Sequence, residues 1–159
     1  MRRVVCITIA TTALESPVAG SDVISILRDA LALVTPPGRS IRIEGFTDLT
    51  AQITLALAID PSLRRPDIET AVRAKLGAVF GRAARNFGEA LPRSAVLAAV
   101  QPVAGVVAAR LDVFALPGGP PESEGRLLCP APSMSGGTFK QAGLLSIDPA
   151  SVQFAEMMP

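Results

Sequence analysis

The chain has 159 residues, of which 49% are hydrophobic and 18% charged, and its formal net charge is +1. This length suits one ordinary domain or two small modules, and the apolar content is enough for a core and argues against disorder. The balanced charge provides no basic face for nucleic acid, and the sequence contains no His, Trp or Tyr, so it lacks the commonest general base and metal ligand. A nearly neutral, apolar chain instead favours self-association or burial by a partner.

The first predicted module covers residues 1–48 and follows a β-α-β pattern. Residues 4–10 alternate and are rich in β-branched side chains, which predicts a strand, although the basic start and apolar run also fit a secretory signal peptide. Ser21 is a suitable N-cap for a helix that ends before Pro36, and a second strand follows at Ser40–Glu44. The helix connects strands that can lie parallel in one sheet. Its expected sheet-facing residues are Val23, Ile24, Leu27, Leu31 and Val34.

The two cysteines, Cys6 and Cys129, lie far apart in the sequence and have no zinc-site spacing. Cys6 falls within the apolar pattern of the first strand, and this favours a small buried thiol over half of a disulfide. We therefore expect synthesis in a reducing compartment, the cytoplasm. No stretch approaches the ~18 apolar residues of a membrane-spanning helix.

The second predicted module covers residues 49–116 and begins with the most regular strand in the chain, Thr50–Asp60. A helix is predicted from Pro66 to Phe80, since Pro suits a first helical position. The strand residues expected on one buried face are Ala51, Ile53, Leu55, Leu57 and Ile59, and the other face is mild enough to be covered too. The helix residues expected to face the sheet are Ile68, Val72, Leu76, Val79 and Phe80.

Basic residues follow the opposite side of this helix and its C-terminal end. Solvation explains such a series, and a patch that binds acidic groups is the sharper alternative. The residues concerned are Arg73, Lys75, Arg82 and Arg85.

A short helix and a strand complete the second module. The helix is predicted at Arg93–Val100, where Val96, Leu97 and Val100 would be buried, and the strand at Val106–Leu116. The Leu-Pro-Gly-Gly-Pro-Pro sequence that begins at Leu116 marks the main module boundary. The strand residues expected on one side are Val107, Ala109, Leu111, Val113 and Ala115.

Residues 117–159 are predicted to form a loop-rich extension. Pro130–Gly137 has loop composition, while Leu144–Ile147 and Val152–Ala155 predict short strands joined at Asp148. A tail of this kind cannot build its own core. It either lies on the preceding module or extends to a neighbouring chain, where main-chain pairing would order it.

The sequence offers little catalytic chemistry. Without His there is no nucleophile–base pair of the usual kind, and no phosphate-binding glycine motif occurs. The glycine pairs at 118–119 and 136–137 predict turns. A hydrolase with paired carboxylates is the weaker alternative. The carboxylates lie at the ends of elements or on exposed faces, at Asp60, Asp67, Glu69, Asp112 and Asp148. We therefore predict a protein that is not an enzyme and has no catalytic, cofactor-binding or metal-ligating residues.

The segment Phe87–Phe114, with the sequence FGEALPRSAVLAAVQPVAGVVAARLDVF, resembles the C-terminal region of baseplate J-like proteins. These proteins are wedge components of contractile phage tails and related injection systems. The matching positions in this segment are Phe87, Gly88, Ser94, Val96, Leu97, Ala98, Val100, Gln101, Val103, Gly105, Val106, Val107 and Leu111. Further matching segments are Arg3–Ile9, Ile41–Gly45, Leu55–Pro61, Ala71–Val72 and Gly143–Asp148.

The resemblance implies small α/β modules with a ferredoxin-like layout, so the expected fold is α/β (α+β) with two such modules and a tail of short strands. It implies a structural role, without catalysis or cofactor, in joining wedges around a hub and spike near the sheath. The implied partners are other wedge subunits and a second copy of the chain, in a baseplate particle assembled after synthesis in the cytoplasm. The alternative function is a free-standing, dimerising α/β module that regulates or binds a ligand between residues 66–80 and the sheet.

Two departures from the family pattern bear on this expectation. Family members are much longer, and a helix and a strand would be expected before Arg3, so the first module resembles an incomplete unit. The loop over residues 118–138 is also long for the family, and we expect it to carry a contact specific to this system.

Overall fold

A computed structural model describes residues 4–36, 39–119, 121–135 and 138–157. Helices and short strands are both abundant, which confirms the mixed α+β class. The chain forms two compact units. Unit 1 contains Met1–Asp48 and Pro130–Gly143, and unit 2 contains Leu49–Cys129 and Leu144–Pro159. Among the described residues, no helix combines the length and apolar character needed to cross a membrane.

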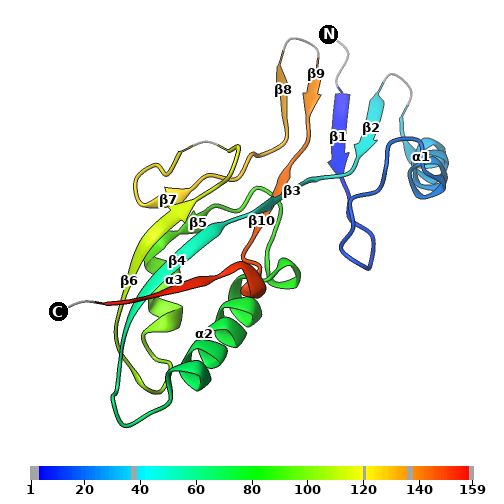
Figure 1. Ribbon diagram of the computed structural model, residues 1–159. Helices are drawn as coiled ribbons and strands as arrows, with labels where there is room; N and C mark the ends of the chain where they lie inside the picture. The colour runs from blue at the N-terminus through cyan, green and yellow to red at the C-terminus, as the bar shows by residue number, and fades with distance from the viewer. Residues whose placement is uncertain (1–3, 37–38, 120, 136–137, 158–159) are drawn as a thin grey trace. The chain divides into compact units, whose positions relative to one another are not determined.

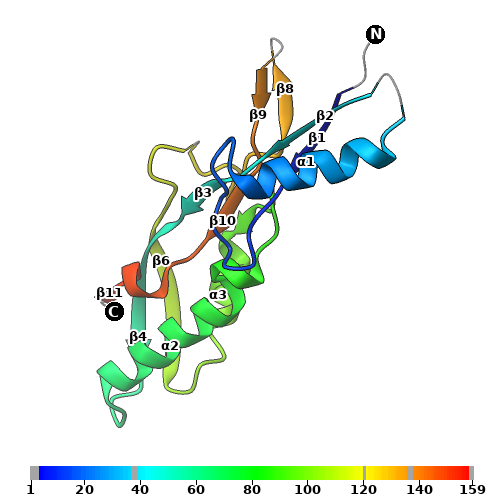
Figure 2. The same cartoon turned by 90° about the vertical axis from the view of Figure 1, so that its right-hand side faces the viewer.

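Unit 1 contains the predicted β-α-β arrangement. Strands β1 (Val4–Thr8) and β2 (Ser40–Glu44) pair in parallel, and helix α1 (Asp22–Val34) connects them. Figures 1 and 2 show α1 along one side of this strand pair. The strand predicted over residues 4–10 is confirmed for residues 4–8 and ends two residues earlier than predicted. Residues 1–3 lie outside the described part.

An antiparallel hairpin completes unit 1. Its strands are β8 (Ser133–Ser135) and β9 (Thr138–Lys140), so the prediction of a loop was wrong for residues 133–135, and residues 136–137 are outside the described part. Phe139 of β9 is buried, and the guanidinium carbon of Arg42 lies over its ring, 5.9 Å from the centre of the Phe139 ring. Gln141 donates a 3.2 Å hydrogen bond to Glu44. These contacts attach the hairpin to β2.

Unit 2 is organised around a three-stranded sheet in the order β11–β4–β6. Strand β4 (Gln52–Ile59) is central, β6 (Val106–Ala115) pairs with it antiparallel, and β11 (Gln153–Glu156) pairs with it in parallel. Helices α2 (Arg65–Phe80) and α3 (Arg93–Val100) lie on one face of the sheet, as Figures 1 and 2 show. The remaining short elements are β3 (Thr47–Thr50), β5 (Leu91–Pro92), β7 (Arg126–Leu127), β10 (Gly143–Ser146) and the 3₁₀ turns η1 (Arg82–Ala84) and η2 (Pro149–Ser151). Strand β5 pairs with β7, and β3 with β10.

The core of unit 2 lies between the sheet and the two helices. The predicted inward face of β4 is buried at Ala51, Ile53, Leu55 and Leu57, and Ala56 on the other face is buried as well. Helix α2 contributes Ile68, Val72, Leu76 and Phe80, and α3 contributes Val96, Ala99 and Val100. Val79 of α2 is 38% exposed, so its predicted burial was wrong. At 100° per residue it lies between Ile68 and Val72 around the helix, so its exposure depends on what covers the last turn of α2 and not on the helical period.

The five residues predicted to share one side of β6 do not all do so, because the strand contains two β-bulges. Thr54 pairs with Val113 and Leu55 with Leu111, which leaves Asp112 as an extra residue. Near the start of the strand, Val107 is extra in the same way. A bulge shifts the alternation by one residue. The side chains that β6 buries are therefore Leu111 and Phe114, whereas Val107 is 72% exposed.

The C-terminal residues pack on unit 2 of the same chain, which is the first of the two predicted alternatives. The predicted strands near residues 144–147 and 152–155 correspond to β10 and β11. In parallel pairing, Gln153 faces Thr54 and Glu156 faces Leu57. The predicted extension 117–159 is therefore divided, since 130–143 belong to unit 1 and the rest to unit 2, whereas the predicted boundary after residue 48 coincides with the division between units.

Candidate interaction surfaces

The carboxylates singled out in the sequence do not meet in a common site. Asp60 accepts hydrogen bonds from the Ser62 hydroxyl (2.7 Å) and the Ser62 main-chain N–H (2.9 Å), and these bonds hold its pKa below the ordinary value. Glu69 pairs with Arg65 at 2.8 Å, one helical turn away on α2. Each of these acids therefore interacts with a residue of its own turn or helix.

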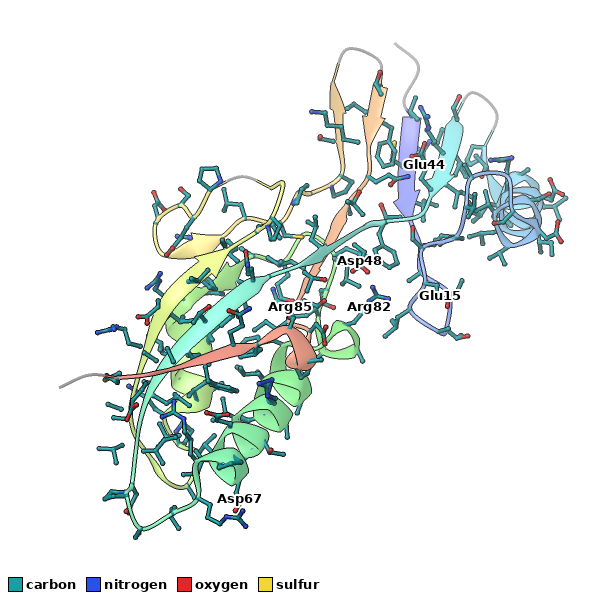
Figure 3. The ribbon with its side chains drawn as sticks, viewed as in Figure 1. Glu15, Glu44, Asp48, Asp67, Arg82 and Arg85 are labelled. Atoms are coloured by element: carbon teal, nitrogen blue, oxygen red, sulfur yellow. The ribbon has the colours of Figure 1, made fainter. Side chains whose placement is uncertain are left out.

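The other three acids are equally local. Asp112 pairs with Arg110 at 2.7 Å, and Asp148 caps η2 by accepting from the Ala150 N–H. Figure 3 shows Asp67 at the first turn of α2, at the end of the helix opposite Arg82 and Arg85. Within the described part of the chain, no group of three or more Cys, Asp or Glu side chains could hold a metal ion.

Two of the four basic residues predicted to be solvated bind the chain itself. Arg73 donates to the carbonyl oxygens of Pro149 (3.3 Å) and Val152 (3.0 Å), and its guanidinium lies 4.7 Å from the centre of the Phe154 ring. It therefore attaches the segment that leads into β11 to helix α2. Lys75 and Arg82 are exposed, as predicted. The proposed acidic-group patch thus loses Arg73.

Arg85 was also wrongly predicted to be solvated, since its side chain is only 5% exposed. It donates to the carbonyl oxygens of Leu145 (3.0 Å), Glu89 (2.8 Å) and Ala90 (2.9 Å) and pairs with the Glu89 carboxylate. Guanidinium groups suit this task because they present five donors in a fixed plane. The side chain ties the loop before β5 to β10.

Unit 2 has a cavity of about 350 Å³ beside the C-terminal end of α2. This volume is at the lower end of the range for small-molecule sites. Ser146 is a buried polar residue in its lining, and Asp148 is already occupied in capping η2. The residues that line the cavity are Thr50, Gly77, Gly81, Arg82, Ser146, Ile147, Asp148 and Pro149.

Helix α1 has more apolar surface than unit 1 covers. Ile24 is buried and Leu27 and Leu31 are half-buried, but the predicted inward residues Val23 and Val34 are 51% and 76% exposed, which corrects that assignment. Ile26 and Leu33, which the sequence analysis did not place in a stripe, are 69% and 88% exposed. We call Val23, Ile26, Ala30, Leu33 and Val34 the outer stripe of α1. The sequence contains an indication of this stripe, because its residues recur with helical spacing beside the inner set of Ile24, Leu27 and Leu31.

Both cysteines are half-buried and neither is in a disulfide, in agreement with the predicted thiol at Cys6. Burial raises the pKa of the Cys129 thiol above its ordinary value, because desolvation disfavours the thiolate. The residue therefore behaves as a packing group near the carbonyl-binding Arg85 and not as an activated nucleophile.

The residues that carry the family resemblance have packing roles in unit 2. Val96 and Val100 are fully buried. Gly105 has a φ of +89°, and a Cβ at this position would lie 2.6 Å from Ile68 Cδ1 and 2.8 Å from Leu63 Cδ1. The left-handed φ favours glycine at this position, and the two methyl groups would have to shift to admit a side chain. No protein-family model matches the chain, and no curated protein matches it.

Proposed function

We propose that this chain is a structural subunit of a baseplate wedge in a phage tail or contractile injection system, and that it is not an enzyme. It would be synthesised in the cytoplasm and join wedges around the hub and spike through protein–protein contacts. The observation that carries an assembly role is the outer stripe of α1, where four large aliphatic side chains are at least half exposed on one short helix. The baseplate assignment itself is supported by the ordered sequence resemblance over residues 87–114.

The use of arginine supports the same proposal. Arg65, Arg73, Arg85 and Arg93 each donate to a main-chain carbonyl oxygen of unit 2. Such bonds fix loops and edge strands against the helices, and charged donors strengthen them. A mechanically loaded component benefits from a unit whose connecting segments are held in this way.

The test is the location of the chain in its native host. An epitope-tagged chain should sediment with sheathed particles in a density gradient and appear in their mass spectrum at a fixed ratio to the tube and spike proteins. An untagged host strain controls for carry-over. Recovery of the chain only in the soluble fraction, in cells that produce complete particles, would contradict the proposal.

The cavity beside α2 supports the second candidate, a free-standing ligand-binding or regulatory module. Its volume of about 350 Å³ accommodates a small polar molecule, and Ser146 and Asp148 provide oxygen atoms at its wall. Native mass spectrometry of freshly purified chain would show a bound small molecule if this function holds. The variant Ser146→Val should then lose the adduct, while a spectrum without any adduct would count against this candidate.

A further inference from the structure

We propose that the outer stripe of α1 binds the same stripe of a second copy of the chain, with the two helices antiparallel. This inference names a partner for the assembly role proposed above. It begins with the distribution of apolar residues around α1. At 100° per residue, the outer stripe lies about a quarter turn away from the inner face of Ile24, Leu27 and Leu31. It therefore faces sideways, where a neighbouring helix lies in a layer of helices on a sheet.

The spacing of the stripe favours a second copy as the occupant. Val23, Ile26, Ala30 and Leu33 follow one another at intervals of three, four and three residues, which is the a/d spacing of a helix–helix seam. The four positions are mirror-symmetric about Arg28. An antiparallel copy therefore places Ile26 of one chain against Ala30 of the other, and Val23 against Leu33. The two-fold axis of the dimer repeats each of these pairs once. Large residues face smaller ones throughout the seam.

The exposed area is sufficient for a weak, specific dimer. Val23, Ile26, Leu33 and Val34 are between 51% and 88% exposed. Their complete burial on two copies would remove on the order of 1,000 Å² from water, the lower limit for a specific interface. Asp29 flanks the seam and Arg28 lies about half a turn away from it, so neither charge interrupts it. We therefore expect a dimer with a dissociation constant on the order of micromolar, within the range of the test below.

The orientation makes a further distinction possible. Asp29 lies one residue from the centre of symmetry, so antiparallel pairing places it close to Asp29 of the second copy, whereas parallel pairing opposes it to apolar positions. Like charges at this separation repel. The variant Asp29→Asn should therefore tighten an antiparallel dimer.

The test is sedimentation velocity of the full chain over about 1–500 µM, with a pair of matched variants. Ala30→Glu puts a charge into the seam, and Ala32→Glu puts the same charge on the same helix, about half a turn from the stripe. Ala30→Glu should weaken self-association by at least about tenfold, and Ala32→Glu should leave it unchanged. Equal circular dichroism spectra and melting temperatures would show that both variants fold.

Cross-linking tests the register. In a chain with Cys6 and Cys129 replaced by Ala, a mixture of Ile26→Cys and Ala30→Cys molecules should form the mixed disulfide faster than either symmetric one. Preferred Ile26→Cys homodimers would overturn the antiparallel arrangement. A monomeric chain at 500 µM, or equal weakening by both charge variants, would overturn the proposal as a whole. A monomer that still co-sediments with particles would contradict only this inference, and a dimer absent from particles only the proposed function.

Discussion

At the scale of single residues, the arginine side chains act mainly within the chain. The sequence pattern predicted that Arg73 and Arg85 are exposed to solvent. Helical periodicity indicates which side of a helix is polar, but it does not show which loops of the chain pack against that side. Arg85 donates to three carbonyl oxygens, those of the nearby Glu89 and Ala90 and that of Leu145, which is distant in the sequence. Loss of such a donor leaves partly buried acceptors without a partner, and this cost exceeds the net value of the bonds.

We therefore expect Arg85→Met to lower the free energy of unfolding by about 2–4 kcal/mol, measured by urea denaturation. Arg110→Met is the matched control, because Arg110 is 62% exposed and bonds only to Asp112 among the described contacts. Its loss should cost far less than the loss of Arg85, because a surface ion pair contributes little to stability. Equal effects of the two substitutions would contradict the proposed role of Arg85.

A second residue-scale prediction concerns Asp60. The Ser62 hydroxyl contributes most to the lowered pKa of Asp60, and the Ser62 N–H contributes further. Ser62→Ala should therefore raise this pKa toward its ordinary value, measured by carbon-13 titration of the carboxyl group. Because the folded pKa is depressed, Asp60 favours the folded state above its unfolded pKa, and this contribution disappears as the pH falls through the folded pKa. Ser25→Ala, in α1, should leave the titration unchanged.

At the scale of elements, close approach decides the effect of a substitution that helix propensity alone would favour. Gly77 lies within α2, where Gly→Ala ordinarily stabilises by about 1 kcal/mol. A Cβ at this position would lie 2.6 Å from Cγ of Pro149, in the turn that leads to β11. The proline ring cannot rotate away from the added methyl group.

We expect Gly77→Ala to destabilise the protein by about 1–3 kcal/mol, because overpacking outweighs the gain in propensity. In a Pro149→Ala background the same change should become neutral or stabilising, since the ring atom that it meets is absent. A double-mutant cycle by chemical denaturation measures this coupling. Additive effects of the two substitutions would show that the contact does not govern the packing.

At the scale of the whole molecule, strand β11 joins the end of the chain to the centre of unit 2. It adds a parallel strand to β4, and the nearby Val152 is almost completely buried. Arg65 donates to the Ala155 carbonyl at 2.9 Å, and Arg73 donates to the Val152 carbonyl. The C-terminal strand is thus held by the sheet on one side and by α2 through its arginines.

Removal of residues 152–159 should therefore cost several kcal/mol, a large part of the stability of a typical domain. It should also speed amide hydrogen exchange along β4, which loses its parallel neighbour. A chain that lacks only residues 158–159 serves as the control and should melt at the same temperature as the full chain. Unchanged exchange in β4 after the longer deletion would contradict a stabilising role for β11.

The sequence by itself determined the local elements. Proline and glycine residues bounded α1, α2 and α3, although Ser21 at the predicted N-cap of α1 makes no side-chain capping bond. The alternation of β4 identified the buried face that organises unit 2. These features depend on neighbours within one or two turns, so a linear pattern contains them. The second apolar period of α1 was also present in the sequence, but periodicity could not say which stripe the rest of the chain would cover.

The tertiary structure alone decided the bulges of β6, the parallel place of β11 and the carbonyl bonds of Arg73 and Arg85. Apart from the Arg85 bonds to Glu89 and Ala90, each of these depends on a partner far along the chain. The pattern of a β-strand does not encode which strand it joins. The same holds for the outer stripe of α1. Its exposure follows from the small size of unit 1, where two paired strands cannot cover both apolar faces of the helix.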